Sequence, residues 1–502
     1  MSSPVPATGE SAALAKDRLG IPAVLFFILS AIAPMTVVAG VVTTLYAVTG
    51  LSAIGAAFVA VALVLAVFAV GYVAMARHIT NAGALYTFVS RGLGRPFGVG
   101  AALIAAIAYN ALQFALYGMF GPTVAAYIAD KFGLDLSWWV WALGAWLLVA
   151  ILGVLRVDLN GRVLAVLLSA EVAVLLVLAI AGIGDPAAGY PLTSLSPGGL
   201  FGHAGVGALL VTALLGYVGF EASAVFSEEA RAPRRTVPIA TYTSLAVIGA
   251  VYVLASWAMS VHYGDDQVAA VAGQQGPGML FAMSSSTMAE IATVLFMTSL
   301  FAAMLSFHNA VGRYMFALGR EHVLPAALGR TEPRTGAPRN ASLCQSAIGL
   351  AVIVLYAVAG WDPTVQLFFW FGTTGGFGVL CLLVATTIAV IRFFALDPHG
   401  ESAWRRLIAP VLAALALVAM LWAGVANYAT LLGVAPGSTA AWAFPGVYAV
   451  AAVIGVAYGV WLRSARPKVY QGIGLGLDTG AAVGPDRPER LTDQAETAGA
   501  GP

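Results

Sequence analysis

Two carboxylic acids interrupt long apolar stretches of this sequence. Glu171 lies in "LLSAEVAVLLVLAI", and Glu221 lies in "GYVGFEAS" beside a glycine and an aromatic residue. A carboxyl group in such surroundings can exchange a proton, coordinate a cation or accept hydrogen bonds from an ammonium group. It can also stay a neutral acid that is hydrogen-bonded inside the protein. His308 is a third titratable group in an apolar stretch, although a lone histidine is more often packed than functional.

The composition decides which elements must position these groups. The chain has 502 residues, of which 60% are hydrophobic and only 9% are charged, and its mean hydropathy is +0.90. Soluble domains carry roughly 25% charged residues, so an integral membrane protein is predicted. A net charge of +1 gives no indication of a nucleic-acid partner. Cys344 and Cys381 lack metal-ligand spacing, and no metal or cofactor is predicted.

Long apolar stretches predict an all-α protein with about twelve membrane-spanning helices. They lie near 21–46, 51–76, 97–128, 137–156, 161–184, 204–226, 237–262, 287–317, 342–360, 364–391, 405–427 and 442–463. If the N-terminus is cytoplasmic, every one of the 24 basic residues except Lys131 falls on the cytoplasmic side. This distribution satisfies the positive-inside rule. We therefore predict a multi-pass plasma-membrane protein with both termini in the cytoplasm.

Hydropathy and composition also divide the chain into three parts. Residues 1–20 are predicted to form a cytoplasmic tail, and residues 21–463 a single transmembrane domain. Residues 464–502 are rich in Gly, Pro, Asp and Glu, which predicts a disordered cytoplasmic tail.

The first and sixth predicted helices carry interruptions. Pro34 lies in the middle of the first, where it removes a backbone donor, and Gly216 and Gly219 lie at the centre of the sixth. Each alone could be an ordinary kink or a close-packing glycine. Because the two helices are five spans apart, two five-helix halves would enter the membrane from opposite sides. Paired interruptions in inverted repeats point to a binding site at the membrane midplane.

Three motifs resemble the amino acid–polyamine–organocation permease family. "GYVGFEASAVFSEEARAPRRTVPIA" is similar to its sixth-helix signature, "ITNAGALYTFVSRGLGRPFGVGAAL" to its loop between helices 2 and 3, and "NAVGRYMFALGREHVLP" to the end of its helix 8. The resemblance covers roughly residues 20–465. It implies a secondary transporter with a five-plus-five inverted repeat (LeuT-like), discontinuous helices 1 and 6, and two extra C-terminal helices.

The resemblance also implies which residues hold the substrate. They are Ile32, Ala33, Pro34, Met35 and Thr36 in helix 1, and Tyr217, Gly219, Phe220 and Glu221 in helix 6. Gly219 is expected to let the substrate approach the backbone, and Phe220 to close over it as a gate. Glu221 could accept the substrate ammonium or bond the backbone donors of its own interrupted helix, and we favour the second role. The family often has a glycine-rich helix 1 here, where this chain has Ala33-Pro34-Met35.

Some family members have a lysine near the place of Glu171, where it occupies the position of a coupling cation. The glutamate found here instead suggests a carboxylate that titrates with the co-transported proton or coordinates a cation. An intramembrane acid is a functional hypothesis by default. His308 is a second candidate for ion coupling, because helix 8 is expected near helices 1 and 5.

The predicted function is import of an amino acid by proton symport with alternating access. An amino acid/amine exchanger or a polyamine/amine permease is the alternative. A polytopic membrane enzyme is not predicted, because the six histidines are dispersed without zinc or hydrolase spacing. A channel would favour repeated rings of polar pore-lining residues, which the sequence lacks.

Overall fold

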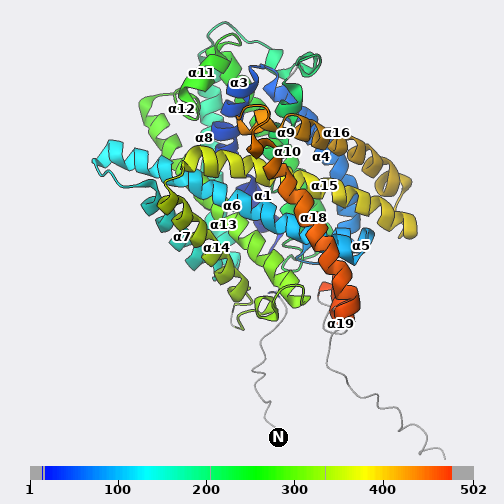
Figure 1. Cartoon of the computed structure of the whole chain (residues 1–502). Helices are drawn as coiled ribbons and strands as arrows, with labels where there is room; N and C mark the ends of the chain where they lie inside the picture. Colours follow the sequence, from blue (N-terminus) through cyan, green and yellow to red (C-terminus); the bar gives the residue numbers. More distant parts are fainter. Residues whose placement is uncertain (1–13, 15–16, 156, 204, 334, 477–502) are drawn as a thin grey trace, which may run out of the picture.

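The computed structural model describes residues 14, 17–155, 157–203, 205–333 and 335–476, and this part of the chain is helical without a β-strand. Figure 1 shows the helices as one bundle, with helix α19 at its lower end. We call that side the terminal face. The prediction of an all-α membrane protein is confirmed.

The first half of the chain supplies the elements around the interrupted helices. They are α1 (Ile21–Ile32), α2 (Pro34–Thr36), η1 (Val37–Val42), α3 (Thr43–Thr49), α4 (Ile54–Ala76), α5 (Ala84–Gly92), α6 (Arg95–Phe132), α7 (Trp138–Gly153), α8 (Val157–Gly184), η2 (Thr193–Leu195), η3 (Pro197–Leu200), α9 (Val206–Leu215), η4 (Phe220–Ala224) and α10 (Pro233–Tyr263).

The second half begins with two short helices on the side of the bundle opposite the terminal face (Figure 1). Its elements are α11 (Val268–Gln275), α12 (Gly278–Phe281), α13 (Ser286–Arg320), η5 (Ala326–Gly329), α14 (Arg339–Ala359), η6 (Pro363–Phe369), α15 (Trp370–Leu396), η7 (Trp404–Ile408), α16 (Ala409–Ala426), α17 (Tyr428–Leu432), α18 (Thr439–Ala465) and α19 (Pro467–Gly472).

The described residues contain 11 helices that are long and apolar enough to cross a membrane, compared with about twelve predicted. The difference lies at the fourth predicted span, where α7 has 16 residues. A rise of 1.5 Å per residue gives it a length of about 24 Å, which is less than the roughly 30 Å of a hydrocarbon core. The helix ends at Gly153, and a turn separates it from α8.

Helix 1 is the centre of the bundle. In the most apolar part of the span Ile21–Thr49, 83% of the residues are buried within the protein, compared with only 17% in the span Thr439–Ala465. The first of these packs against α8, α10 and α13, and α18 runs along the outside (Figure 1). Both are apolar, but only α18 presents its apolar surface outward, as expected for contact with lipid.

The segment that follows α18 is folded as far as the structure describes it. Disorder was predicted from residue 464, yet α18 continues to Ala465 and α19 follows from Pro467. The Arg95 guanidinium donates to the Gln471 carbonyl and lies over the Tyr470 ring. Ile473 is 1% exposed. Residues 477–502 and 1–13 lie outside the described residues.

Candidate substrate-binding site

The interruption of helix 1 is centred on Ala33. This residue has a left-handed backbone, with φ 53° and ψ 73°, and Pro34 follows it. Proline has no N–H, so it cannot donate to the Ser30 carbonyl four residues earlier. The Met35 N–H is the next donor, and it leaves the helix to bind the Glu171 carboxylate on α8. The break in helix 1 is therefore held by a side chain from another helix.

The interruption of helix 6 is centred on Gly219. Helix α9 ends at Leu215, and Gly219 adopts φ 115°, which a side chain disfavours. A Cβ atom at this position would lie 3.1 Å from the Ala31 Cβ and 3.1 Å from the Ile32 nitrogen. Glycine is therefore required for the contact between the two interrupted helices. Space that we expected for a substrate is occupied here by the backbone of helix 1.

Glu171 links three helices at the first interruption. Its side chain is 1% exposed and accepts a hydrogen bond of 2.8 Å from the Ser299 hydroxyl on α13, in addition to the Met35 N–H. Ser299 also lies 3.2 Å from the Thr36 hydroxyl. A change in the charge of this carboxyl would therefore reach helix 1, α8 and α13 together.

Glu221 serves the second interruption from within its own helix. Its carboxylate accepts the Gly219 N–H at 3.0 Å and the Tyr109 hydroxyl at 2.7 Å. Its backbone carbonyl accepts the Tyr72 hydroxyl at 2.5 Å. Of the two roles considered for Glu221, the structure shows the bond to a backbone donor of the interrupted helix.

The aromatic residues of the sixth helix pack away from the break. Phe220 meets Phe68 edge-on, with ring centroids 5.9 Å apart. Tyr217 donates its hydroxyl to the Phe58 carbonyl at 3.0 Å. In this conformation Phe220 contacts α4 and does not lie over the break. The sequence analysis had expected it to close over the substrate as a gate.

His308 is separated from the other candidate coupling group by the direction of its side chain. Its Nε2 lies 2.8 Å from the Ser342 hydroxyl on α14, and a Cβ atom on Gly153 of α7 would come within 2.4 Å of it. Glu171 instead contacts Ser299 on α13, facing helix 1. Predicted helix 8 corresponds to α13, and predicted helix 5 to α8. Their predicted proximity to each other and to helix 1 is confirmed, because α13 packs against α1 and α8. The structure does not, however, bring the side chains of His308 and Glu171 together.

A cavity of about 140 Å³ lies beside the helix-1 interruption and extends away from the terminal face. Three predicted site residues, Ile32, Ala33 and Thr36, line it, and it reaches Val48, which is 49% exposed. The other predicted residues, namely Pro34, Met35, Tyr217, Gly219, Phe220 and Glu221, belong to the packed interruptions around it rather than to its described lining.

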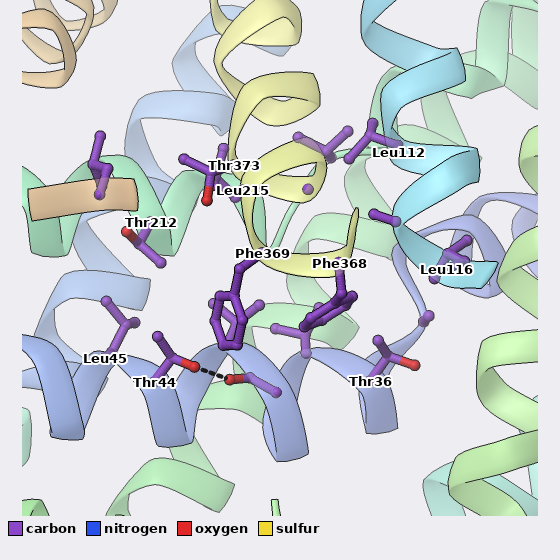
Figure 2. Close-up of a pocket in the computed structure, with 18 of the residues that line it drawn as sticks. Thr36, Thr44, Leu45, Leu112, Leu116, Thr212, Leu215, Phe368, Phe369 and Thr373 are labelled. Carbon is purple, nitrogen blue, oxygen red and sulfur yellow. Dashed lines mark hydrogen bonds between the residues drawn. The ribbon is translucent and has the colours of Figure 1, made fainter. Parts of the chain in front are cut away.

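The opposite walls of the cavity come from residues that the sequence analysis did not identify. Leu112 and Leu116 of α6, and Phe368 and Phe369 of η6, face the helix-1 segment (Figure 2). Phe307 of α13 completes this apolar wall. The aromatic run "FFWFG" before the glycines of α15 was the available signal, since glycines in a membrane helix allow close packing.

The terminal side of the two interruptions is closed by buried ion pairs. Arg313 forms two bonds with Glu229, at 2.6 and 3.1 Å, and Arg320 forms two with Glu228, at 2.7 and 2.8 Å. All four side chains are at most 4% exposed. The cavity thus reaches the surface away from the terminal face, at Val48, and the buried ion pairs lie on the terminal side.

The ends of helices 1 and 6 are also joined through their backbones. The Leu19 N–H donates to the Glu229 carbonyl at 3.0 Å, and the Arg231 N–H donates to the Leu19 carbonyl at 2.7 Å. Nearby, Phe27 of helix 1 stacks on Phe226 at 4.5 Å. These contacts hold the first part of helix 1 against the segment that follows helix 6.

Comparison with known proteins identifies relatives of this chain. Residues 19–457 match a family described as amino acid permease. The chain is 30% identical over 291 residues to the branched-chain amino acid permease of Lactococcus lactis subsp. cremoris, which covers 54% of this chain and 62% of that protein. It is 28% identical over 208 residues to cationic amino acid transporter 4 of Homo sapiens, covering 40% and 30%. The histidine permease of Saccharomyces cerevisiae is 28% identical over 212 residues, covering 39% and 34%. The chain thus spans less than two thirds of each of these relatives.

Proposed function

Because the chain belongs to the amino acid permease family of the amino acid–polyamine–organocation superfamily, we propose that it imports an amino acid across the plasma membrane. The proposal includes proton symport and alternating access. One observation carries it: the Glu171 carboxylate binds the Met35 N–H, the first backbone donor after the proline that interrupts helix 1. A titratable group is thereby joined to the element that borders the cavity.

Alternating access is supported by the unequal ends of the cavity. It reaches the surface at Val48, whereas the terminal side carries the Arg313–Glu229 and Arg320–Glu228 pairs. With the terminal face in the cytoplasm, as the basic residues favour, this is the outward-facing form. The inward-facing form then requires these pairs to separate.

The coupling step follows from the two states of Glu171. An ionised carboxylate accepts hydrogen bonds only, and it suits the donors from Met35 and Ser299. A protonated acid is neutral and costs less in an apolar site, but it offers these donors a weaker acceptor. The two states therefore stabilise different conformations of helix 1, and a difference of this kind couples a proton gradient to substrate movement.

Uptake by proteoliposomes tests the proposal. Wild-type protein should concentrate an amino acid when the outside is one pH unit more acidic, by up to about tenfold for one proton per substrate. Glu171→Gln should retain binding and exchange but lose accumulation. The exposed-loop variant Glu332→Gln is the matched control and should behave as wild type.

The same assay separates the alternatives. Equal accumulation by Glu171→Gln would remove this residue from the coupling mechanism. Uptake that depends only on amino acid inside the vesicles would indicate an exchanger, and uptake of amines without a carboxylate would indicate an amine permease.

A further inference from the structure

We propose that the cavity selects amino acids with uncharged, apolar side chains and rejects lysine and arginine. This inference rests on the proposed transport of amino acids and specifies their class. It starts from the chemistry of the cavity wall, because the relatives named above include transporters of both branched-chain and cationic amino acids.

The first argument is the charge of the wall. Its described lining contains no Asp, Glu, Lys, Arg or His. The two buried acids of the region, Glu171 and Glu221, lie outside the lining and already accept hydrogen bonds from the protein. The side-chain ammonium of lysine or guanidinium of arginine would therefore enter without a carboxylate partner, which is a strongly unfavourable burial.

The second argument is the apolar surface that faces helix 1. Leu112 and Leu116 lie on one side, Phe307 comes from α13, and Phe368 and Phe369 descend from η6 (Figure 2). Burying one methylene group on such a surface raises affinity about fourfold. Leucine and isoleucine should therefore bind more tightly than valine, and valine more tightly than alanine.

The third argument is that some wall hydroxyls are already engaged. Thr44 donates to the Gly40 carbonyl at 2.7 Å (Figure 2), and Thr36 lies 3.2 Å from the Ser299 hydroxyl. The Thr44 hydroxyl already donates its one proton to the protein, so it can only accept a hydrogen bond from a substrate. Both threonines contribute their methyl groups and chain atoms to the same largely apolar wall.

Phe369 is the residue that tests the wall most directly, because the chain offers a matched control two positions later. Phe369 lines this cavity. Phe371 instead lines a second cavity and packs on Phe114 and Tyr356, with ring centroids 6.2 and 6.3 Å apart. Truncating either residue removes the same atoms from one continuous helical segment, but from nearly opposite faces, because two residues correspond to about 200° of rotation.

The experiment measures competition with labelled leucine in wild-type proteoliposomes. Isoleucine and valine should compete strongly, alanine at least tenfold more weakly than leucine, and lysine and arginine at least a hundredfold more weakly. Phe369→Ala should weaken leucine binding about tenfold, whereas Phe371→Ala should change it less than twofold. Binding of leucine by scintillation proximity in detergent provides the same comparison when a variant reconstitutes poorly.

The outcomes separate this inference from the function on which it rests. Transport of lysine or arginine as efficient as that of leucine would overturn the selectivity and leave amino acid transport intact. Transport of no amino acid would overturn both. Equal effects of Phe369→Ala and Phe371→Ala would show that the wall described here does not contact the side chain.

Discussion

The two sides of the helix interruptions differ in chemistry, because one is apolar and the other is charged. On the open side, aliphatic and aromatic residues such as Leu116 and Phe369 surround the cavity. On the terminal side, Arg313 and Glu229 are each only 2% exposed and bind each other through two hydrogen bonds. One side has no ionised group in its described lining, and the other is closed by ionised groups.

This difference indicates how a transporter can combine a tight seal with reversible opening. Opening an apolar contact exposes its surface to water at a cost of about 25 cal/mol per Å². Separating an ion pair loses the attraction but returns both charges to water, whose solvation largely compensates. Charged closure on the terminal side therefore suits an element that has to open, and the apolar side suits recognition of the substrate.

The largest expected effect comes from breaking one terminal pair. Arg313→Ala leaves the Glu229 carboxylate buried without its partner, and removing one member of a buried pair costs about 3–5 kcal/mol. The free energy of unfolding in detergent should fall by this amount. The exposed pair of Arg339 and Glu332, with side chains 59% and 30% exposed, provides the control, since Arg339→Ala should cost about 0–1 kcal/mol.

A double variant distinguishes pairing from packing. Arg313→Met combined with Glu229→Leu removes both charges and should recover most of the lost stability. If the double variant is as unstable as Arg313→Ala, the packing of the Arg313 guanidinium over the Phe226 ring, at 4.7 Å, is the main interaction.

Features that depend on a single residue could be predicted from the sequence. Pro34 predicted the interruption of helix 1, and Gly216 and Gly219 predicted that of helix 6, because proline and glycine act locally on the backbone. Apolar length predicted most of the spans. At the fourth predicted span, 137–156, the structure also has an apolar helix, α7, which with 16 residues is shorter than predicted.

Features that depend on partners distant in the sequence could not be predicted. The partners of Glu228 and Glu229 are Arg320 and Arg313, which lie 92 and 84 positions away in the sequence. The cavity wall likewise combines α6 with η6. Composition also failed for residues 466–476, since a glycine-rich segment can fold when a buried acceptor such as Glu321 binds its backbone.

An intermediate effect is expected where the two sides meet. Gly219→Ala places a side chain at φ 115° and 3.1 Å from the Ala31 Cβ. A strained backbone of this kind costs about 1–3 kcal/mol, so the melting temperature should fall and the two interruptions should move apart. Gly144→Ala on α7 is the control, because nothing lies within 4 Å of the added methyl group.

Leucine binding by Gly219→Ala tests whether the contact between the two interruptions shapes the cavity. Affinity for leucine should fall together with stability, because Ile32 and Ala33 line the cavity while Ala31 and Ile32 contact Gly219. A stable variant with normal leucine binding would show that the contact between the interruptions does not shape the cavity.

The smallest expected effect concerns Glu321, next to the terminal pairs. Its carboxylate accepts the Gly474 N–H at 2.9 Å, the Gly476 N–H at 3.2 Å and the Asn81 side chain at 3.2 Å. Burial raises the pKa of the Glu321 carboxyl above its usual value of 4.5, although these donors and Arg320 oppose the rise. The C-terminal segment is thus docked on a titratable group.

The sign of the pH dependence follows from this raised pKa. The docked form binds the proton more tightly than the undocked form, so docking is most stable in acid and weakens as the pH rises through the raised pKa. A spin label at Leu475, with Cys344 and Cys381 replaced, should show a mobile fraction that increases as the pH rises above 4.5, the value from which burial raises the pKa of Glu321. Glu321→Gln cannot titrate and should give a mobile fraction independent of pH.

An identical pH profile in this variant would assign the dependence to another group, and a flat wild-type profile would show that the docking of this segment is not linked to the ionisation of Glu321.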